Sequence, residues 1–184
     1  MESWPTRLTY AAVVSYKLDA TAIPIRPIRE TDALSFRAAL DAVCRERRYL
    51  ARAEAPPIEK VRAFVEGNIR AGIPQFVAED GGAVVGWCDA IPDARFGHTH
   101  VAVLGMGVLA AYRGRKIGFH LLEAVIAATR RRQIEKIELV VRASNQPALA
   151  LYRKVGFQTE GTKQRGILVD GQYDDLVLMG LFLR

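Results

Sequence analysis

Two short blocks of residues, 113–118 and 145–157, constrain the fold of this chain more than any other feature. The first reads R-G-R-K-I-G and precedes a stretch whose apolar residues have helical spacing. Amides in the first turn of such a helix lack intrahelical partners, and together with the helix dipole they form an anion site. The second reads N-x-x-A-x-x-L-Y-x-x-x-G-F, so Asn145 and Tyr152 can share one helical face. Few folds need both features in this order.

Each block taken alone also has an ordinary structural explanation. A basic glycine turn is often only a turn, and Asn145 can simply cap a helix that begins beside Pro147. Tyr152 can be a half-buried aromatic residue on a stripe with Ala148 and Val155. The joint occurrence of the two blocks favours the functional interpretation.

Hydrophobic periodicity and turn signals predict a strand, two helices, three strands, a helix, a strand, a helix and two strands. That order predicts an α/β fold with a mixed, largely antiparallel twisted sheet of about six to seven strands and helices on both faces. The expected strands are 22–28, 74–79, 83–91, 98–108, 137–141, 157–169 and 172–183, and the expected helices are 32–48, 58–71, 117–132 and 147–155.

Several local signals refine these elements. Thr31 is predicted to cap the helix 32–48, and Gly105 with Gly107 indicates a β-bulge near the end of strand 98–108. The dipeptide at 170–171 is Asp-Gly, the strongest short hairpin signal. The apolar face of helix 58–71 is expected to consist of Val61, Val65 and Ile69.

The length of 184 residues fits one domain, which we expect to span 21–184. Residues 1–20 are expected to form an N-terminal extension or an extra strand, with 8–16 as the strand candidate. No apolar run approaches the roughly 18 residues that span a bilayer, so no membrane partner is expected. Cys44 and Cys88 match no metal spacing, which predicts no metal site and a reducing, cytoplasmic setting.

The net charge of +6 is concentrated at 113–116 and 130–132. A basic surface can bind nucleic acid, an anionic membrane or a phosphorylated cofactor. Nucleic-acid binding favours interleaved aromatic residues or a recognition helix, and the sequence has neither near these positions. The run 130–132 is read as a solvated helix end, and no nucleic-acid partner is predicted.

Together the two blocks resemble the acetyl-coenzyme A site of the GCN5-related N-acetyltransferases (GNAT). The family motif is Q/R-x-x-G-x-G/A; Arg113 and Gly118 match it, whereas Lys116 stands in place of its central glycine. The resemblance covers about 24–183 and implies the acyl-CoA N-acyltransferase fold. Homodimers are common in the family, so a homodimer is a possible assembly.

The resemblance also implies where acetyl-coenzyme A binds. The strand that ends at Val108 would splay from strand 137–141, and the gap would receive the pantetheine arm. The amides of Met106 and Val108 would hold its carbonyls, Asn145 would contact the arm, and Tyr152 would lie near the sulfur. The implied cofactor-binding residues are Met106, Gly107, Val108, Arg113, Gly114, Arg115, Lys116, Ile117, Gly118, Asn145 and Tyr152.

The implied reaction is direct attack on acetyl-coenzyme A by a primary amine of a small molecule, an amino acid or a protein N-terminus. Tyr152 would be the general acid for the leaving thiolate, since a phenol pKa near 10 suits that role. His100, on the strand leading to Val108, is the first candidate for the general base. Glu79, Asp89 and a water chain are alternatives, and His100 can also be an ordinary strand residue.

A different class of function remains open at this stage. Lys116 departs from the family motif, so the chain could instead be a non-catalytic or regulatory module that binds acyl-coenzyme A. A side chain at this position could clash with the cofactor or add a cation beside it, while the backbone amide is retained in either case.

Overall fold

The computed structural model describes residues 23–183, so the expectations for the N-terminal extension lie outside the described residues. The chain forms one seven-stranded sheet in the order β1-β2-β3-β4-β5-β7-β6. The strands are β1 Ile25–Pro27, β2 Gln75–Asp80, β3 Ala83–Pro92, β4 Val101–Val108, β5 Lys136–Arg142, β6 Gln158–Val169 and β7 Gln172–Phe182. The helices are α1 Ala33–Arg45, α2 Ile58–Arg70, α3 Ile117–Arg130 and α4 Gln146–Val155. The predicted fold class and element order are confirmed.

The helices cover both faces of the sheet and create two apolar cores. The larger core lies under α3 and α4 and includes Leu121, Leu122 and Tyr152. The smaller core lies between the sheet and the helices α1 and α2. There the Phe36 and Trp87 rings pack edge to face, with their centroids 5.7 Å apart. Within the described part of the chain, no helix is long and apolar enough to cross a membrane.

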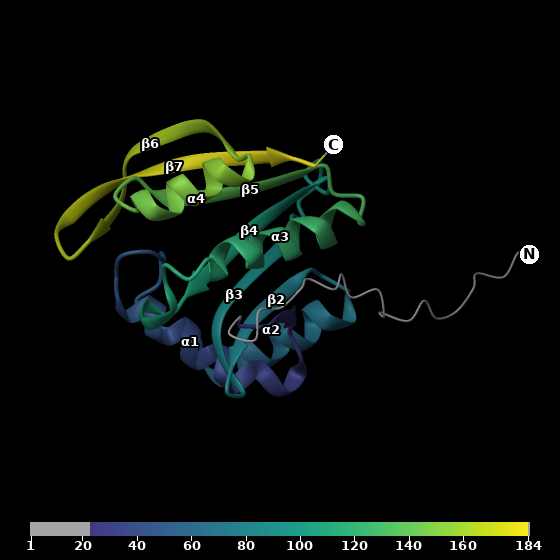
Figure 1. Ribbon diagram of the computed structural model, residues 1–184. Coiled ribbons are helices and arrows are strands. Elements are labelled where there is room, and N and C mark those ends of the chain that lie inside the picture. The colour runs from purple at the N-terminus through teal and green to yellow at the C-terminus, as the bar shows by residue number, and fades with distance from the viewer. Residues whose placement is uncertain (1–22, 184) are drawn as a thin grey trace, which may run out of the picture.

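The strands β4 and β5 form the only parallel pair of the described sheet, and they separate before they end. Their ladder runs from Val101 opposite Lys136 to Val103 opposite Glu138, and no pairing is formed beyond it. Figure 1 shows the two strands diverging past this point. The divergence leaves one side of the last part of β4 without a neighbouring strand.

The expected bulge at Gly105 and Gly107 is wrong. The ladder between β3 and β4 keeps its register from Gly86–Val108 to Pro92–Ala102 without a shift. The two glycines instead accommodate large neighbours on β3. A Cβ at Gly107 would lie 2.3 Å from the Trp87 ring, and one at Gly105 would lie 2.9 Å from the Asp89 carboxylate.

Two other local expectations also differ from the structure. Thr31 lies inside a short 3-10 helix, Glu30–Asp32, and it is the Asp32 carboxylate that accepts a hydrogen bond from the Arg29 amide at 2.7 Å. On α2 the buried face consists of Val61, Val65 and Asn68, whereas Ile69 is 39% exposed. A polar residue therefore occupies the helical face that was expected to be wholly apolar.

Candidate active site

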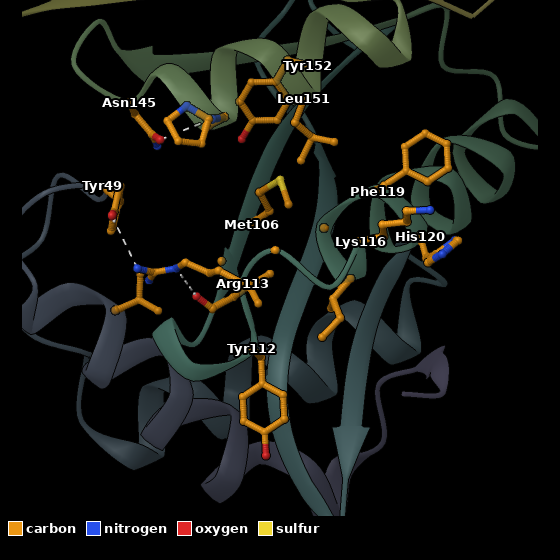
Figure 2. A pocket seen from close by; sticks show the side chains of 18 of the residues that line it. Tyr49, Met106, Tyr112, Arg113, Lys116, Phe119, His120, Asn145, Leu151 and Tyr152 are labelled. Atoms are coloured by element: carbon orange, nitrogen blue, oxygen red, sulfur yellow. Dashed lines mark hydrogen bonds between the residues drawn. The ribbon is translucent and has the colours of Figure 1, made fainter. Parts of the chain in front are cut away.

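A cavity of about 610 Å³ lies where β4 and β5 diverge. Its walls come from the end of β4, the loop before α3, the first turn of α3, and α4 (Figure 2). It brings together all the predicted cofactor-binding residues except Arg115. The sequence did not single out Val43, Tyr49, Phe119, Leu151 and Lys154, which also line it. Of these, Leu151 and Lys154 lie within the second block and Phe119 directly follows the first. Val43 and Tyr49 come from α1 and its following loop, which carry no motif.

The backbone at the end of β4 presents amides to this cavity. The carbonyl of His100 accepts a hydrogen bond from Lys136 of β5, and that of Val101 accepts one from the residue after β3. Backbone groups alternate in direction along a strand. The N–H and C=O groups of the even-numbered residues of β4 therefore point toward β5. The amides of Met106 and Val108 therefore point into the gap, beyond the last β4–β5 pair.

The loop before α3 has the backbone shape of an anion site. Gly114 and Lys116 both adopt the left-handed conformation, with φ of 77° and 62°. No side chain caps the N-terminus of α3, so the first-turn amides are left to the cavity beside Ile117 and Gly118. Such a turn, together with the helix dipole, suits a diphosphate. The residues present thus fit the pyrophosphate of coenzyme A.

The Arg113 side chain is bonded to neighbouring groups, so its charge is already paired at the cavity. Its Nε donates to the Val108 carbonyl at 2.9 Å, and its guanidinium pairs with Glu46 at 2.5 Å. It also lies over the Tyr49 ring, 4.6 Å from the centroid, and Figure 2 shows the two side chains together. Because Glu46 neutralises Arg113, the cations left at the cavity wall are Lys116 and Lys154.

Arg115 is the one predicted cofactor residue that lies outside the cavity. It is exposed, and its guanidinium lies over the Tyr112 ring, 5.2 Å from the centroid.

Asn145 and Tyr152 both face the cavity from α4, as the helical spacing predicted (Figure 2). Asn145 also caps this helix, because its Oδ1 accepts a hydrogen bond from the Ala148 amide at 3.3 Å. The capping and lining roles are compatible, since the side-chain NH₂ group is not used by the cap. Tyr152 is 7% exposed, and its ring packs on Phe157 at 5.7 Å.

Burial controls the protonation of Tyr152 and its neighbour Cys88. Burial raises the pKa of the Tyr152 phenol well above its ordinary value, and the negative charge of a Cys88 thiolate would raise it further. Burial also raises the pKa of Cys88, with a smaller contribution from Asp89. Both groups are therefore neutral at pH 7, and the phenol remains a proton donor.

His100 is not brought to the cavity. It is exposed and precedes β4, at the end of the strand opposite Val108. Eight residues of strand span roughly 25 Å, which is too far for proton transfer at the thioester. Glu79 is no better placed, because it pairs with Arg26 at 2.5 Å. The geometry thus argues against both residues as the general base.

Residues 40–157 match the model of the Acetyltransferase (GNAT) family. The chain belongs to this family. It is 34% identical over 111 residues to the L-amino acid N-acetyltransferase AaaT of Escherichia coli, a match that covers 60% of this chain and 68% of that protein. The family predicted from the sequence is confirmed.

Solved GNAT structures share the fold. The ribosomal-protein-alanine N-acetyltransferase of Brucella melitensis is 27% identical, with a TM-score of 0.81 over 87% of this chain and 99% of that one. The yncA structure from Salmonella typhimurium, solved with acetyl-CoA, is 19% identical; its TM-score is 0.84 over 89% of this chain and 95% of that one. These likenesses confirm the predicted fold. Membership of the GNAT family, which uses acetyl-coenzyme A as co-substrate, and the named relative confirm an N-acetyltransferase.

One prediction concerns the loop before α3. Gly114→Asp should weaken coenzyme A binding by more than tenfold, or about 1.4 kcal/mol, because it places an anion against the phosphates. Gly114→Asn is the matched control, since it has the same shape, tolerates the positive φ of 77° and carries no charge. Calorimetry should show that the Asn variant keeps most of the affinity. Equal coenzyme A affinities of the folded Gly114→Asp and Gly114→Asn variants would show that the phosphates do not bind at this loop.

A second prediction concerns Lys116. Lys116→Gly restores the family motif and relieves a left-handed backbone that costs a non-glycine residue about 1 kcal/mol, yet it should not tighten coenzyme A binding. The lost cation should instead weaken binding a few-fold. Lys116→Asn also tolerates this φ and lacks the charge, so it should bind as weakly as the Gly variant. A several-fold gain of affinity in Lys116→Gly would show that the lysine obstructs the cofactor.

Proposed function

We propose that this protein transfers the acetyl group of acetyl-coenzyme A to the α-amino group of an amino acid or of a peptide N-terminus. The observation that carries the proposal is a single cavity that joins the Met106 and Val108 amides, the start of α3 and the Tyr152 hydroxyl. The acceptor class is supported by two relatives, whose names specify L-amino acids and the alanine of a ribosomal protein.

Each part of the cavity has a role in this reaction. The start of α3 binds the diphosphate and so fixes the position of the thioester. The Val108 amide donates to the carbonyl oxygen as the amine attacks and negative charge develops there. Tyr152 then protonates the departing sulfur. Although burial makes the phenol a weaker acid, the thiolate leaves into the same surroundings, and its pKa rises for the same reason.

The acceptor would approach from the face of the sheet opposite α4. On this face Val103 and Val140 flank the gap and are 45% and 57% exposed. The loop after α1 and the turn between β6 and β7 are joined beside it by the Arg47–Asp170 pair, with bonds of 2.6 and 2.8 Å. An open, partly apolar surface bounded by two loops can accept an amino acid side chain or an extended peptide. We place the reaction in the cytoplasm, where both buried cysteines stay reduced.

The test is an assay of coenzyme A thiol release with acetyl-coenzyme A and a panel of amines. Free L-amino acids and peptides with a free N-terminus should be acetylated, and mass spectrometry should place the acetyl group on the α-nitrogen. N-terminally blocked peptides that contain lysine are the control and should be inert. Binding of coenzyme A without thiol release above background for any amine would support the non-catalytic module instead.

A further inference from the structure

Three polar side chains are buried side by side in the smaller core, away from the cofactor cavity. Asn68 of α2, Gln75 of β2 and Asp89 of β3 are 5%, 3% and 7% exposed. Asn68 Nδ2 donates to Gln75 Oε1 at 2.9 Å. The strand register pairs Gln75 with Asp89. Since residues directly opposite on neighbouring strands point to the same face, these three residues form a polar row between α2 and the sheet.

The row ends at the place where β4 and β5 diverge. Asp89 pairs with Gly105 of β4, and its Oδ1 lies 2.9 Å from where a Cβ of Gly105 would be. The carboxylate therefore lies over the β4 backbone. On the far side of β4 the pairing with β5 has already stopped at Val103. Thus Asp89 borders the gap from the face on which the acceptor would approach.

The row is incomplete in its hydrogen bonding. Gln75 Nε2 is buried and has no hydrogen-bond partner among the described residues. A buried N–H group without a partner is costly, and a buried carboxylate more so, which makes such a row unusual unless it serves a function. The register places the Asp89 carboxylate opposite this N–H group, although no hydrogen bond joins the two in the structure.

We propose that Asp89 accepts the proton that the acceptor ammonium group must lose, and that Gln75 positions the Asp89 carboxylate. This inference rests on the proposed function. Gly105 precedes Val108 by three residues, or roughly 10 Å of strand, so the proton passes through water. The N–H bond breaks, the freed lone pair forms the C–N bond, and the C–S bond breaks. Tyr152 protonates the sulfur, the second amine proton restores Tyr152 through solvent, and Asp89 releases its proton to solvent.

The surroundings of Asp89 suit a proton acceptor at neutral pH. Burial raises the pKa of Asp89 from 3.8 to about 7, while a hydrogen bond from the Gly105 backbone opposes the rise. The groups beside it on α2, β2 and β4 are Asn68, Gln75 and Gly105, none of which titrates in this range. Cys88, its neighbour on β3, stays protonated because burial raises its pKa. Across the gap, β5 contributes Lys136 and Glu138. Lys136 Nζ pairs with both Glu138 and Glu160 of β6, at 2.7 and 2.8 Å, so this group carries a net negative charge.

The test is the pH dependence of kcat/KM for the acceptor. In the wild-type enzyme log kcat/KM should rise through a limb near pH 7. Asp89→Asn should lower kcat/KM by about 10²-fold at pH 7 and abolish this limb. Calorimetry should show acetyl-coenzyme A affinity within about twofold of wild type, because Asp89 lies outside the cofactor cavity. Glu66→Gln, which removes an exposed carboxylate from α2, is the control and should change neither quantity.

A second variant tests the positioning role and covers a failure of Asp89→Asn to fold. Gln75→Met removes the amide donor at similar volume, so the limb should move to higher pH while the plateau rate is retained. If Gln75 had only a structural role, Gln75→Met would lower stability and leave the pH of the rise in log kcat/KM unchanged. An unmoved limb in Gln75→Met, or an intact limb in Asp89→Asn, overturns the proposal. If wild-type protein binds acetyl-coenzyme A but acetylates no amine, the proposed function itself fails.

Discussion

Tyr152→Phe should lower the turnover number by roughly 10²-fold or more, because it removes only the hydroxyl that we propose protonates the leaving thiolate. The ring packs on Phe157 at 5.7 Å, and the substitution retains that contact. The hydroxyl has no hydrogen-bond partner among residues 23–183, so stability should change little. Acetyl-coenzyme A affinity should also be nearly unchanged, because the loss is confined to the transition state.

Steady-state kinetics with chemistry rate-limiting, together with calorimetry, would check this result. Tyr173→Phe is the matched control, because Tyr173 is 59% exposed on β7 and does not line the cavity. It should retain normal turnover. A Tyr152→Phe enzyme with more than half the wild-type rate would falsify the general-acid role. The fold and the cofactor site would stand.

The sequence predicted those parts of the molecule that depend on local spacing. Seven residues on α4 place Asn145 and Tyr152 toward one cavity whatever the rest of the chain does. The turn chemistry at 80–82 and 170–171 correctly joined consecutive strands. The turn at Gly114 before α3 was also predictable, because a glycine followed by the start of a helix is a local signal.

Features that depend on long-range contacts could not be predicted. Helical periodicity placed Ile69 in the core, but Asn68 is buried because its partner is Gln75 on a different element. The motif suggested that Arg113 is a phosphate ligand, yet Glu46, far away in the sequence, neutralises it. His100 suited the role of general base from its residue type alone, but its distance from Val108 along β4 argues against that role. In each case the missing information is which element packs against which.

Gly107→Ala should destabilise the protein by about 3 kcal/mol and impair catalysis together, although the change adds a single methyl group. That methyl would lie 2.3 Å from Cη2 and 2.7 Å from two further atoms of the Trp87 ring. Trp87 is 3% exposed and is held by Phe36, so it cannot move without disturbing the smaller core. For a chain of this size the loss corresponds to a Tm lower by about 6–12 °C.

The catalytic effect follows from the position of Gly107 between Met106 and Val108, whose amides face the cavity. Pushing the strand away from Trp87 shifts both amides, so kcat and acetyl-coenzyme A affinity should fall along with Tm. Trp87→Phe shortens the ring that causes the clash. The double variant should therefore lose at least about 1 kcal/mol less unfolding free energy than the two single variants lose in sum. Gly161→Ala, on β6 with no atom within 4 Å of the new methyl, is the control and should be neutral. A Gly107→Ala protein that melts within about 2 °C of wild type would show that Trp87 moves freely, and that β4 is not held in place by it.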